Sequence, residues 1–285
     1  MRTDRRGSLG LLAAGAVFPL VRPPRSRELR FGLTPVVLDD DRVLMEGLEG
    51  YLRRVTNFDV LIVRRRTYQE ITTLLLAGQL DAAWICGYPF VQFRDRLELV
   101  AVPLWRGRPL YRSYVIVPAD GTAERLSDLR GTVHAFSDPD SNSGWLATTA
   151  ELVRRGEEPG RFFRHVFFTY AHRKVARAVA ARLADGGSID GYVFEVLREV
   201  EPELAARCRV LRRSPLFGFP PVACRRLDAG SEPVLRLREA LLAMAEEPDG
   251  RAVLAHLRLD GFTAGTPDLF GSIAANARLV ARALG

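Results

Sequence analysis

Short apolar runs alternate with apolar residues at helical spacing along most of the chain. The runs at 59–63 and 81–86, for example, flank a segment that starts with a capping box from Thr67 to Glu70 and stops at Gly78. Strand–helix alternation of this kind predicts a parallel sheet with right-handed crossovers. The predicted strands lie at residues 29–35, 59–63, 81–86, 97–102, 114–117, 132–136, 165–170, 189–194 and 207–211. The predicted helices lie at residues 39–56, 68–77, 144–155, 173–184, 232–246, 249–257 and 271–283.

The alternation divides into two similar halves. The runs Gly78–Ala83 and Gly186–Gly191 stand at equivalent points, and each holds a helix stop, a short turn and an aspartate at a strand start. A chain of 285 residues is also longer than one hydrophobic core usually supports. We therefore predict an α/β protein with two open α/β domains. Ligands are expected at the carboxyl ends of the strands, in the crevice between the domains.

The composition is that of an ordered, globular protein with an arginine bias. Hydrophobic residues make up 47% of the chain and charged residues 26%. The formal net charge is +7, yet Lys174 is the only lysine, which is typical of a GC-rich coding background. The arginine clusters at 64–66, 212–213 and 225–226 each lie at the end of a strand and are interpreted as solvated strand ends. Nucleic acid is therefore not an expected partner.

The first 22 residues differ from the rest of the chain. Arg2, Arg5 and Arg6 precede an uncharged run from Gly7 to Val21, which has the length of a secretory signal and is short for a membrane span. The paired arginines admit a twin-arginine (Tat) route beside the general secretory (Sec) route. We expect residues 1–27 to be a signal peptide and linker, and the mature protein to be an exported, soluble monomer.

Three cysteines, Cys86, Cys208 and Cys224, lack the spacing of a zinc site or a redox motif. In an exported protein Cys208 and Cys224 could form a disulfide. The odd count and the apolar surroundings favour buried thiols instead, so both possibilities stay open. No sequence motif indicates a metal or another cofactor, and none is expected.

A polar loop separates the predicted strand at 132–136 from the predicted helix at 144–155. Ser141, Asn142 and Ser143 in this loop are residue types that cap helices, and the N–H groups of a first helical turn have no partner within the helix. These donors and the positive end of the helix dipole together favour an anion. An ordinary capped helix has the same sequence signature.

Six segments, in order over residues 28–270, resemble the phosphonate-, phosphite- and phosphate-binding proteins of ABC importers. The segments are Thr67-Tyr68 with the helix end at 76–84, Tyr111–Val117, Leu126–Gly131, Asp138–Gly144, Phe168–His172 and Ser214–Val222. The resemblance implies the two-lobed periplasmic-binding-protein fold of type II, with two open α/β domains joined by a two-segment hinge. We place lobe I at 28–115 and 221–285, lobe II at 116–220, and the hinge near 112–118 and 212–222.

The same resemblance implies a ligand site. The ligand-binding residues are expected to be Tyr68, Tyr111, Ser141, Asn142, Ser143 and His172. The serines, the asparagine and nearby N–H groups would hold the oxyanion, the histidine would donate to it, and the tyrosines would approach from lobe I. Each residue alone also has a structural interpretation, as a helix-start tyrosine, a strand-edge tyrosine, a helix cap or a core histidine.

Two departures from the family pattern bear on the ligand. Tyr170 stands where the family often has glycine, two residues before the histidine, and Asn142 stands where a serine or threonine is usual. In addition, the segment Phe217–Pro221 carries none of the carboxylates that family members use for the ammonium group of aminoalkylphosphonates. Glu195 is a possible acidic contact, with a solvated helix surface as the simpler interpretation. We therefore expect a compact oxyanion or an apolar-tailed phosphonate, with two phenylalanines of that segment, Phe217 and Phe219, as tail contacts.

The expected function is that of an exported, non-catalytic protein that captures a phosphorus oxyanion between two lobes. It would deliver this small anionic ligand to the inner-membrane permease of an ABC importer, or present it to a sensor kinase. The same fold could instead bind a sulfonate or a small organic solute such as a thiamine-precursor pyrimidine. An enzyme would need a triad such as Ser141 or Ser143 with His172 and Asp190, but the nucleophile-elbow motif is absent from the sequence, as is the P-loop.

Overall fold

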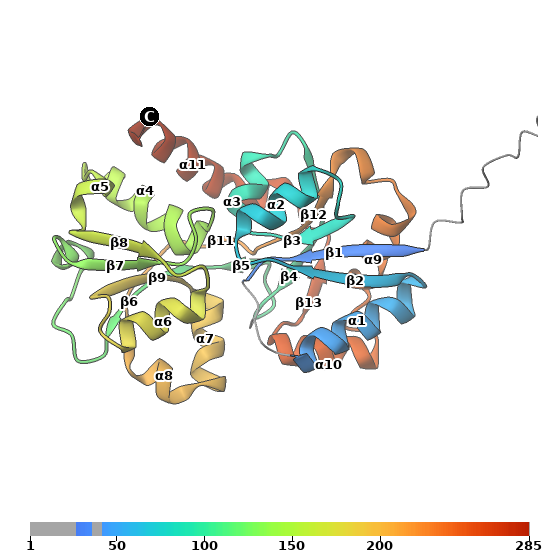
Figure 1. Ribbon diagram of the computed structural model, residues 1–285, viewed down its shortest axis with the longest axis horizontal. Coiled ribbons are helices and arrows are strands. Elements are labelled where there is room, and N and C mark those ends of the chain that lie inside the picture. The colour runs from blue at the N-terminus through green and yellow to red at the C-terminus, as the bar shows by residue number, and fades with distance from the viewer. Residues whose placement is uncertain (1–26, 36–41, 285) are drawn as a thin grey trace, which may run out of the picture.

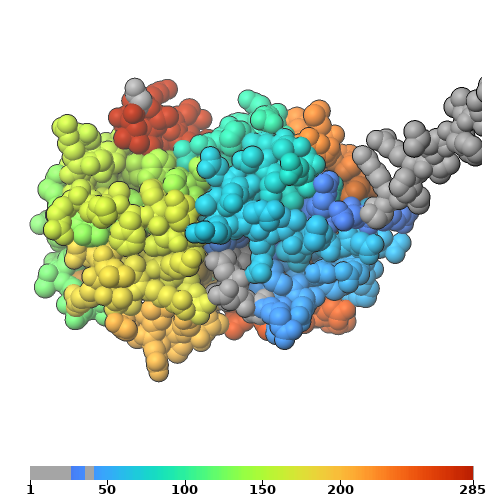
Figure 2. All heavy atoms as spheres, viewed as in Figure 1, coloured from blue at the N-terminus to red at the C-terminus, as the bar shows by residue number. Residues whose placement is uncertain are grey.

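The computed structural model describes residues 27–35 and 42–284, which form two α/β lobes lying side by side (Figure 1). Each lobe is built around a sheet of its own, as the alternating pattern predicts. The atoms of the two lobes meet along their junction (Figure 2). The signal peptide and linker expected at residues 1–27 lie outside the described residues, except for Arg27.

The sheet of lobe I has six strands in the order β13-β4-β12-β3-β1-β2. They are β1 (Glu28–Leu33), β2 (Asp59–Arg64), β3 (Ala82–Trp84), β4 (Leu97–Leu104), β12 (Val222–Arg225) and β13 (Gly261–Thr263). β1 is parallel to β2 and to β3, which confirms the parallel pairing predicted for this part of the chain. β12 is antiparallel to β3 and β4, so the returning chain enters the middle of the sheet.

The helices of lobe I lie where helical spacing predicts them, except for the short helix α3, which was not predicted. They are α1 (Arg42–Thr56), α2 (Tyr68–Leu76), α3 (Gly87–Gln92), α9 (Glu232–Leu242), α10 (Pro248–Leu257) and α11 (Gly271–Leu284), with 3₁₀ turns η3 (Arg226–Asp228) and η4 (Pro267–Phe270). α2 starts with the predicted capping box, in which the Thr67 hydroxyl and the Glu70 carboxylate each accept from the other residue's backbone N–H. Within the described part of the chain, no helix is long and apolar enough to cross a bilayer.

The sheet of lobe II has five strands in the order β10-β6-β9-β7-β8. They are β6 (Ser113–Pro118), β7 (Val133–Phe136), β8 (His165–Phe168), β9 (Gly186–Asp190) and β10 (Cys208–Arg213). The helices are η1 (Leu126–Leu129), η2 (Asn142–Leu146), α4 (Ala147–Arg154), α5 (Pro159–Phe162), α6 (His172–Ala180), α7 (Gly191–Val200) and α8 (Pro202–Ala206). β7 is parallel to β8 and β9, so their carboxyl ends share one edge of the sheet.

The strand predicted at 189–194 is wrong in its second half. β9 ends at Asp190, and α7 begins at the next residue. The Asp190 carboxylate accepts from the N–H groups of Tyr192 at 2.8 Å and Val193 at 3.3 Å, and it thereby caps α7. The apolar residues after Asp190 are therefore the buried face of a helix, which a short apolar run does not distinguish from a strand.

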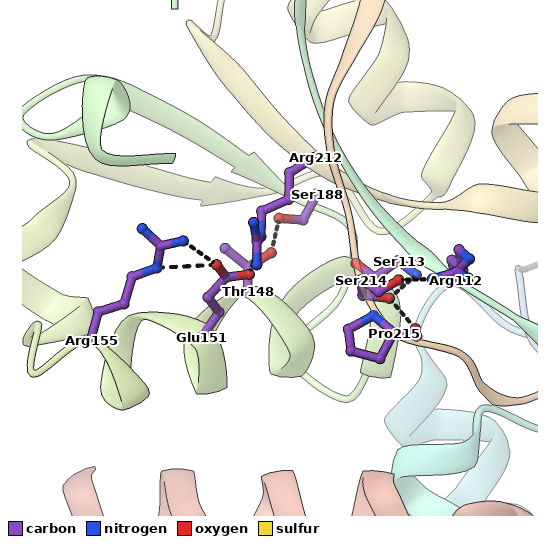
Figure 3. A network of polar contacts seen from close by, with 9 residues as sticks. All are labelled: Arg112, Ser113, Thr148, Glu151, Arg155, Ser188, Arg212, Ser214 and Pro215. Carbon is purple, nitrogen blue, oxygen red and sulfur yellow. Dashed lines mark hydrogen bonds and ion pairs between the residues drawn. The ribbon is translucent and has the colours of Figure 1, made fainter. Parts of the chain in front are cut away.

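Two chain segments join the lobes. β5 (Leu110–Tyr111) pairs antiparallel with β11 (Phe217–Gly218) in a two-stranded ribbon. Beside this ribbon the Ser113 N–H donates to Ser214 Oγ at 2.9 Å, and the Arg112 guanidinium donates to the Ser214 carbonyl (Figure 3). β6 begins at Ser113, so it crosses the lobe boundary predicted between 115 and 116. The domain bounds therefore stay a prediction. In the ribbon, β5 directly precedes the predicted hinge segment 112–118, and β11 lies within the predicted segment 212–222.

The last helix, α11, extends from lobe I across the junction and over α4 of lobe II (Figure 1). Arg154 of α4 donates to the side-chain oxygen of Asn276 in α11, and Asn276 is buried. The return segment 221–285, predicted to belong to lobe I, therefore also packs on lobe II through its final helix.

All three cysteines are buried, unpaired thiols. Cys208 lies in β10 and Cys224 in β12, and these strands belong to different sheets. The buried-thiol interpretation is therefore confirmed over the disulfide. Burial raises the pKa of Cys86 and of Cys224 to about 12 and that of Cys208 to about 11, so all three keep their protons at neutral pH.

His134 is a fully buried histidine in the core of lobe II. Its ring stacks on Phe163 with the centroids 4.3 Å apart, and its Nε2 lies 2.9 Å from Ser188 Oγ. Ser188 Oγ also lies 2.7 Å from Thr148 Oγ1 (Figure 3). Burial lowers the pKa of His134 to about 3, so the ring is neutral in the folded protein.

This buried histidine makes the folded state sensitive to acid. An unfolded histidine titrates near pH 6.5, so the stability contributed by neutral His134 is present above that pH and is lost as pH falls towards 3. We predict that His134→Phe, which keeps a ring against Phe163 but cannot bind a proton, flattens this dependence. When stability is measured by urea unfolding, the free energy of unfolding of the wild type should fall by about 2 kcal/mol more than that of the variant between about pH 7.5 and about pH 5. Parallel stability curves for the two proteins would contradict the prediction.

Candidate functional site

The six side chains predicted to bind ligand meet at the junction of the lobes. Tyr68 and Tyr111 come from lobe I and the hinge, and the other four come from lobe II. Each of the six is at most 2% exposed, so the site is enclosed between the lobes. The residues are Tyr68, Tyr111, Ser141, Asn142, Ser143 and His172.

The polar loop after β7 forms an unusually wide turn. Ser141 is the N-cap of η2, and its Oγ accepts from the Gly144 N–H at 2.9 Å. η2 is a π-turn that continues directly into α4, and such turns are frequent at functional sites. A Cβ at Gly144 would lie 1.7 Å from Ser137 Oγ, so only glycine permits this close packing of the loop. The sequence therefore predicts both the cap and the helix, but not the π-turn between them.

Two hydrogen bonds fix the tautomer of His172. The Asp190 N–H donates to His172 Nδ1 at 3.1 Å, so Nδ1 carries a lone pair. Burial lowers the pKa of His172 to about 3, so the ring is neutral and its proton is on Nε2. His172 Nε2 lies 3.1 Å from Tyr68 Oη, to which it donates across the lobe junction.

A second pair of contacts crosses the junction at Asn142. Its Nδ2 donates to Tyr111 Oη at 2.9 Å, and its backbone N–H donates to Cys86 Sγ at 3.2 Å. The rings of Phe217 and Phe219 lie 6.4 and 5.6 Å from that of Tyr111, measured between centroids. These two phenylalanines, expected to contact a ligand tail, therefore pack against Tyr111 and support it.

Two buried carboxylates complete the site, and the sequence analysis assigned neither to the ligand site. Asp138 Oδ2 accepts from the Tyr68 N–H at 3.1 Å, so a carboxylate of lobe II caps helix α2 of lobe I. Burial raises the pKa of Asp138, although the N–H groups of Asp140 and Tyr68 oppose the shift. Burial likewise raises the pKa of Asp190 to about 7, against the opposing effect of its two capping N–H groups and the Ser143 hydroxyl.

Glu195, the acidic contact considered from sequence, belongs to another part of the molecule. It accepts from Tyr114 Oη at 3.1 Å and forms longer ion pairs with Arg198 and Arg106. Besides Asp138, the acidic group near the predicted ligand is instead Asp190. Burial raises the pKa values of Tyr68 and Tyr111, and the charge of Asp190 adds to both shifts. An aspartate at the carboxyl end of a parallel strand is the sequence signal that could have identified it.

The geometry does not form a serine–histidine–aspartate relay. His172 Nδ1 contacts the backbone of Asp190 rather than its carboxylate, and Nε2 contacts a phenol rather than a serine. A histidine with a pKa of about 3 is also a poor general base at neutral pH. Among the described residues, no group of three or more histidine, cysteine, aspartate or glutamate side chains could hold a metal ion. The arrangement is one of neutral donors suited to binding.

Solved structures with the same two-lobed fold include transport proteins and a sensor domain. A binding-protein component of an ABC phosphonate transporter from Pseudomonas aeruginosa is 21% identical, with a TM-score of 0.82 over 90% of this chain and 88% of that one. PhnD1 from Prochlorococcus marinus, solved in complex with methylphosphonate, is 17% identical, with a TM-score of 0.79 over 89% and 98%. A histidine kinase sensor domain with similarity to periplasmic binding proteins is 17% identical, with a TM-score of 0.58 over 83% and 99%. The predicted type II periplasmic-binding-protein fold is therefore confirmed.

The sequence itself matches a family model. Residues 31–270 fit the model described as "ABC transporter, phosphonate, periplasmic substrate-binding protein". That family consists of transport proteins and is not a class of enzymes. Since the match spans most of the 285 residues, the chain belongs to the periplasmic phosphonate-binding proteins of ABC transporters.

Proposed function

We propose that the lobe junction binds a phosphorus oxyanion, a simple phosphonate first of all, and that the protein delivers it to the permease of an ABC importer. One observation carries the proposal: uncharged donors from both lobes converge on the N-terminal end of η2 and α4, and all of them are buried. Hydroxyl groups beside a helix N-terminus favour an anion, and exclusion of water strengthens the attraction. As a periplasmic family member, the protein would act outside the cytoplasmic membrane, and export through residues 1–27 stays a prediction.

The protons available to a ligand follow from the contacts within the site. Ser141 Oγ already accepts from the Gly144 N–H, so its own hydroxyl proton is free to donate. Tyr68 Oη accepts from His172 Nε2, and burial raises the pKa of Tyr68 well above its ordinary value, so the phenol proton is also available. His172 therefore acts through Tyr68 unless a ligand displaces the phenol.

Closure of the lobes would be coupled to this ligand. Tyr68, Tyr111 and Cys86 on the lobe I side each contact a polar group of lobe II. An anion that takes donors from both sides stabilises the closed state relative to the open one, which is a shift of population about the hinge. Such closure gives a permease a loaded form that differs in shape from the empty one.

The site geometry favours a compact tetrahedral oxyanion over a planar ring. Phe217 and Phe219 pack on Tyr111 and are almost fully buried, so they support the site rather than form a stacking surface. Asp190 adds one constraint, since an ionised carboxylate repels a bound anion whereas a protonated one does not.

We predict that replacing both Ser141 and His172 with alanine abolishes binding without unfolding the protein. Hydrogen bonds to a charged group contribute about 1.5–3 kcal/mol each, so losing the Ser141 donor, and with His172 the bond that orients the Tyr68 phenol as a second donor, should lower affinity for methylphosphonate at least about 100-fold. Isothermal titration calorimetry measures the affinity. Thermal unfolding with phosphate, phosphite, methylphosphonate, sulfate, taurine and a thiamine pyrimidine ranks the ligands, because a ligand specific to the folded state raises its stability.

Ser127→Ala provides a matched control, because Ser127 is an exposed serine of lobe II outside the junction. It should bind methylphosphonate as the wild type does. Unchanged affinity in the double variant would remove the proposed site. A thermal response to sulfonate or pyrimidine alone would keep the fold and overturn the ligand class.

Asp190→Asn should make methylphosphonate binding less dependent on pH. The pKa of Asp190 is about 7, and a bound anion favours its protonated form, so wild-type affinity should fall above pH 7, by up to about tenfold per pH unit. Asparagine cannot ionise, and its oxygen can still cap α7. The ratio of variant to wild-type affinity should therefore rise between about pH 6 and about pH 9, with the titration of the ligand itself cancelling in the ratio. A constant ratio would show that Asp190 does not face the anion.

A further inference from the structure

A basic cavity of about 490 Å³ lies between the lobes, beside the enclosed site. Its lining includes side chains from the end of β2 and the start of α2 in lobe I, and from the β8–α6 loop and the start of α6 in lobe II. The charged and aromatic members are Arg64, Arg65, Arg66, Glu70, Tyr170 and Lys174. We call this cavity the basic vestibule.

Cations outnumber carboxylates among the described residues that line the basic vestibule. These residues include the exposed cations Arg66 and Lys174 and one carboxylate. That carboxylate, Glu70, is engaged in the capping box, where it accepts from the Thr67 N–H at 2.9 Å and the Thr67 hydroxyl at 3.0 Å, and these bonds lower its pKa. In residues 27–35 and 42–284, no ion pair joins Arg66 or Lys174 to a carboxylate. Cations from two lobes that converge on one cavity attract an anion.

The basic vestibule begins where the enclosed site ends. Arg66 stands two residues before Tyr68, and Tyr170 stands two residues before His172. The residues between, Thr67 and Ala171, both have extended backbones, so the Cα atoms of Arg66 and Tyr68, and those of Tyr170 and His172, lie about 7 Å apart. A tail of two or three carbons on a bound phosphonate spans a comparable distance.

Tyr170 has a strained backbone at this position. Its φ is 57°, in the left-handed region that residues other than glycine rarely adopt. Its N–H donates to the Ser137 carbonyl at 2.6 Å, and its side chain remains 40% exposed in the cavity wall. A phenol that lines the cavity at the expense of backbone strain is a further polar contact for a ligand tail.

We propose that the basic vestibule binds a second anionic group of the ligand, a carboxylate or another phosphoryl group two or three carbons from the phosphonate. This inference rests on the proposed function, because the phosphonate itself occupies the enclosed site. The enclosed site holds one oxyanion with neutral donors and needs no cation. Arg66 and Lys174, one from each lobe, add a charge-assisted clamp for the tail and also hold the lobes closed.

Three ligands test the proposal on the mature chain by isothermal titration calorimetry. Methylphosphonate probes the enclosed site, propylphosphonate adds an apolar tail, and 3-phosphonopropionate ends a tail of the same length in a carboxylate. The wild type should bind 3-phosphonopropionate at least about tenfold more tightly than propylphosphonate, because the clamp is charge-assisted. Arg66→Gln combined with Lys174→Gln should remove this preference and change methylphosphonate affinity less than about threefold.

A charge-matched control separates the clamp from general attraction. Arg161→Gln combined with Arg236→Gln removes two exposed arginines, one from each lobe and both outside the basic vestibule, and should keep the preference. If the wild type bound the two tailed ligands with equal affinity, the inference would be overturned. Binding of methylphosphonate in the same experiment would still support the enclosed site. If R66Q/K174Q lowered the affinity for all three ligands equally, the inference would also be overturned, because long-range electrostatic attraction alone would explain that result. Failure of every phosphonate to bind would overturn both proposals.

Discussion

Asp190 is the residue on which the geometry of the enclosed site depends. Its backbone N–H bonds to His172 Nδ1, its carboxylate caps α7, and the Ser143 hydroxyl bonds to the same carboxylate. The first contact fixes the histidine tautomer, which in turn directs Nε2–H at Tyr68. One residue at the carboxyl end of β9 thus orients donors contributed by both lobes. The raised pKa of its carboxyl group is a consequence of holding these contacts away from water.

The molecule separates neutral donors from cations. Hydroxyl, amide and imidazole groups occupy the enclosed junction, and the arginines and Lys174 that line the basic vestibule are exposed. Burying an unpaired arginine in the junction would be costly when no ligand is present, whereas exposed cations remain hydrated. Neutral donors avoid that cost and still stabilise an anion through oriented dipoles. This separation accounts for a site that can close without ligand through contacts among its own residues.

Local patterns in the sequence predicted two α/β lobes, and the family resemblance named six side chains that are buried at the lobe junction, although their role in binding stays a prediction. The capping box at Thr67 and the cap at Ser141 are encoded within a few residues, so their local geometry is readable without the tertiary structure. The contact between Asp138 and the Tyr68 N–H joins residues 70 positions apart, and no local pattern encodes it. The strand predicted at 189–194 is wrong only after Asp190, because the apolar run there follows a helix cap that was interpreted as a strand start. The arginines at 64–66 were interpreted as solvated strand ends. Their position in one cavity with Tyr170 and Lys174 depends on how the lobes meet, and no local sequence pattern encodes that.

The most direct test of the account is a crystal structure of the mature protein grown with methylphosphonate. We predict electron density for the oxyanion between the lobes, within hydrogen-bonding distance of Ser141 Oγ and Tyr68 Oη, with α2 and η2 on opposite sides of it. His172 should keep its bond to the Asp190 N–H in that structure. A ligand bound outside the lobe junction, or a junction closed by its own contacts with methylphosphonate elsewhere, would contradict the account.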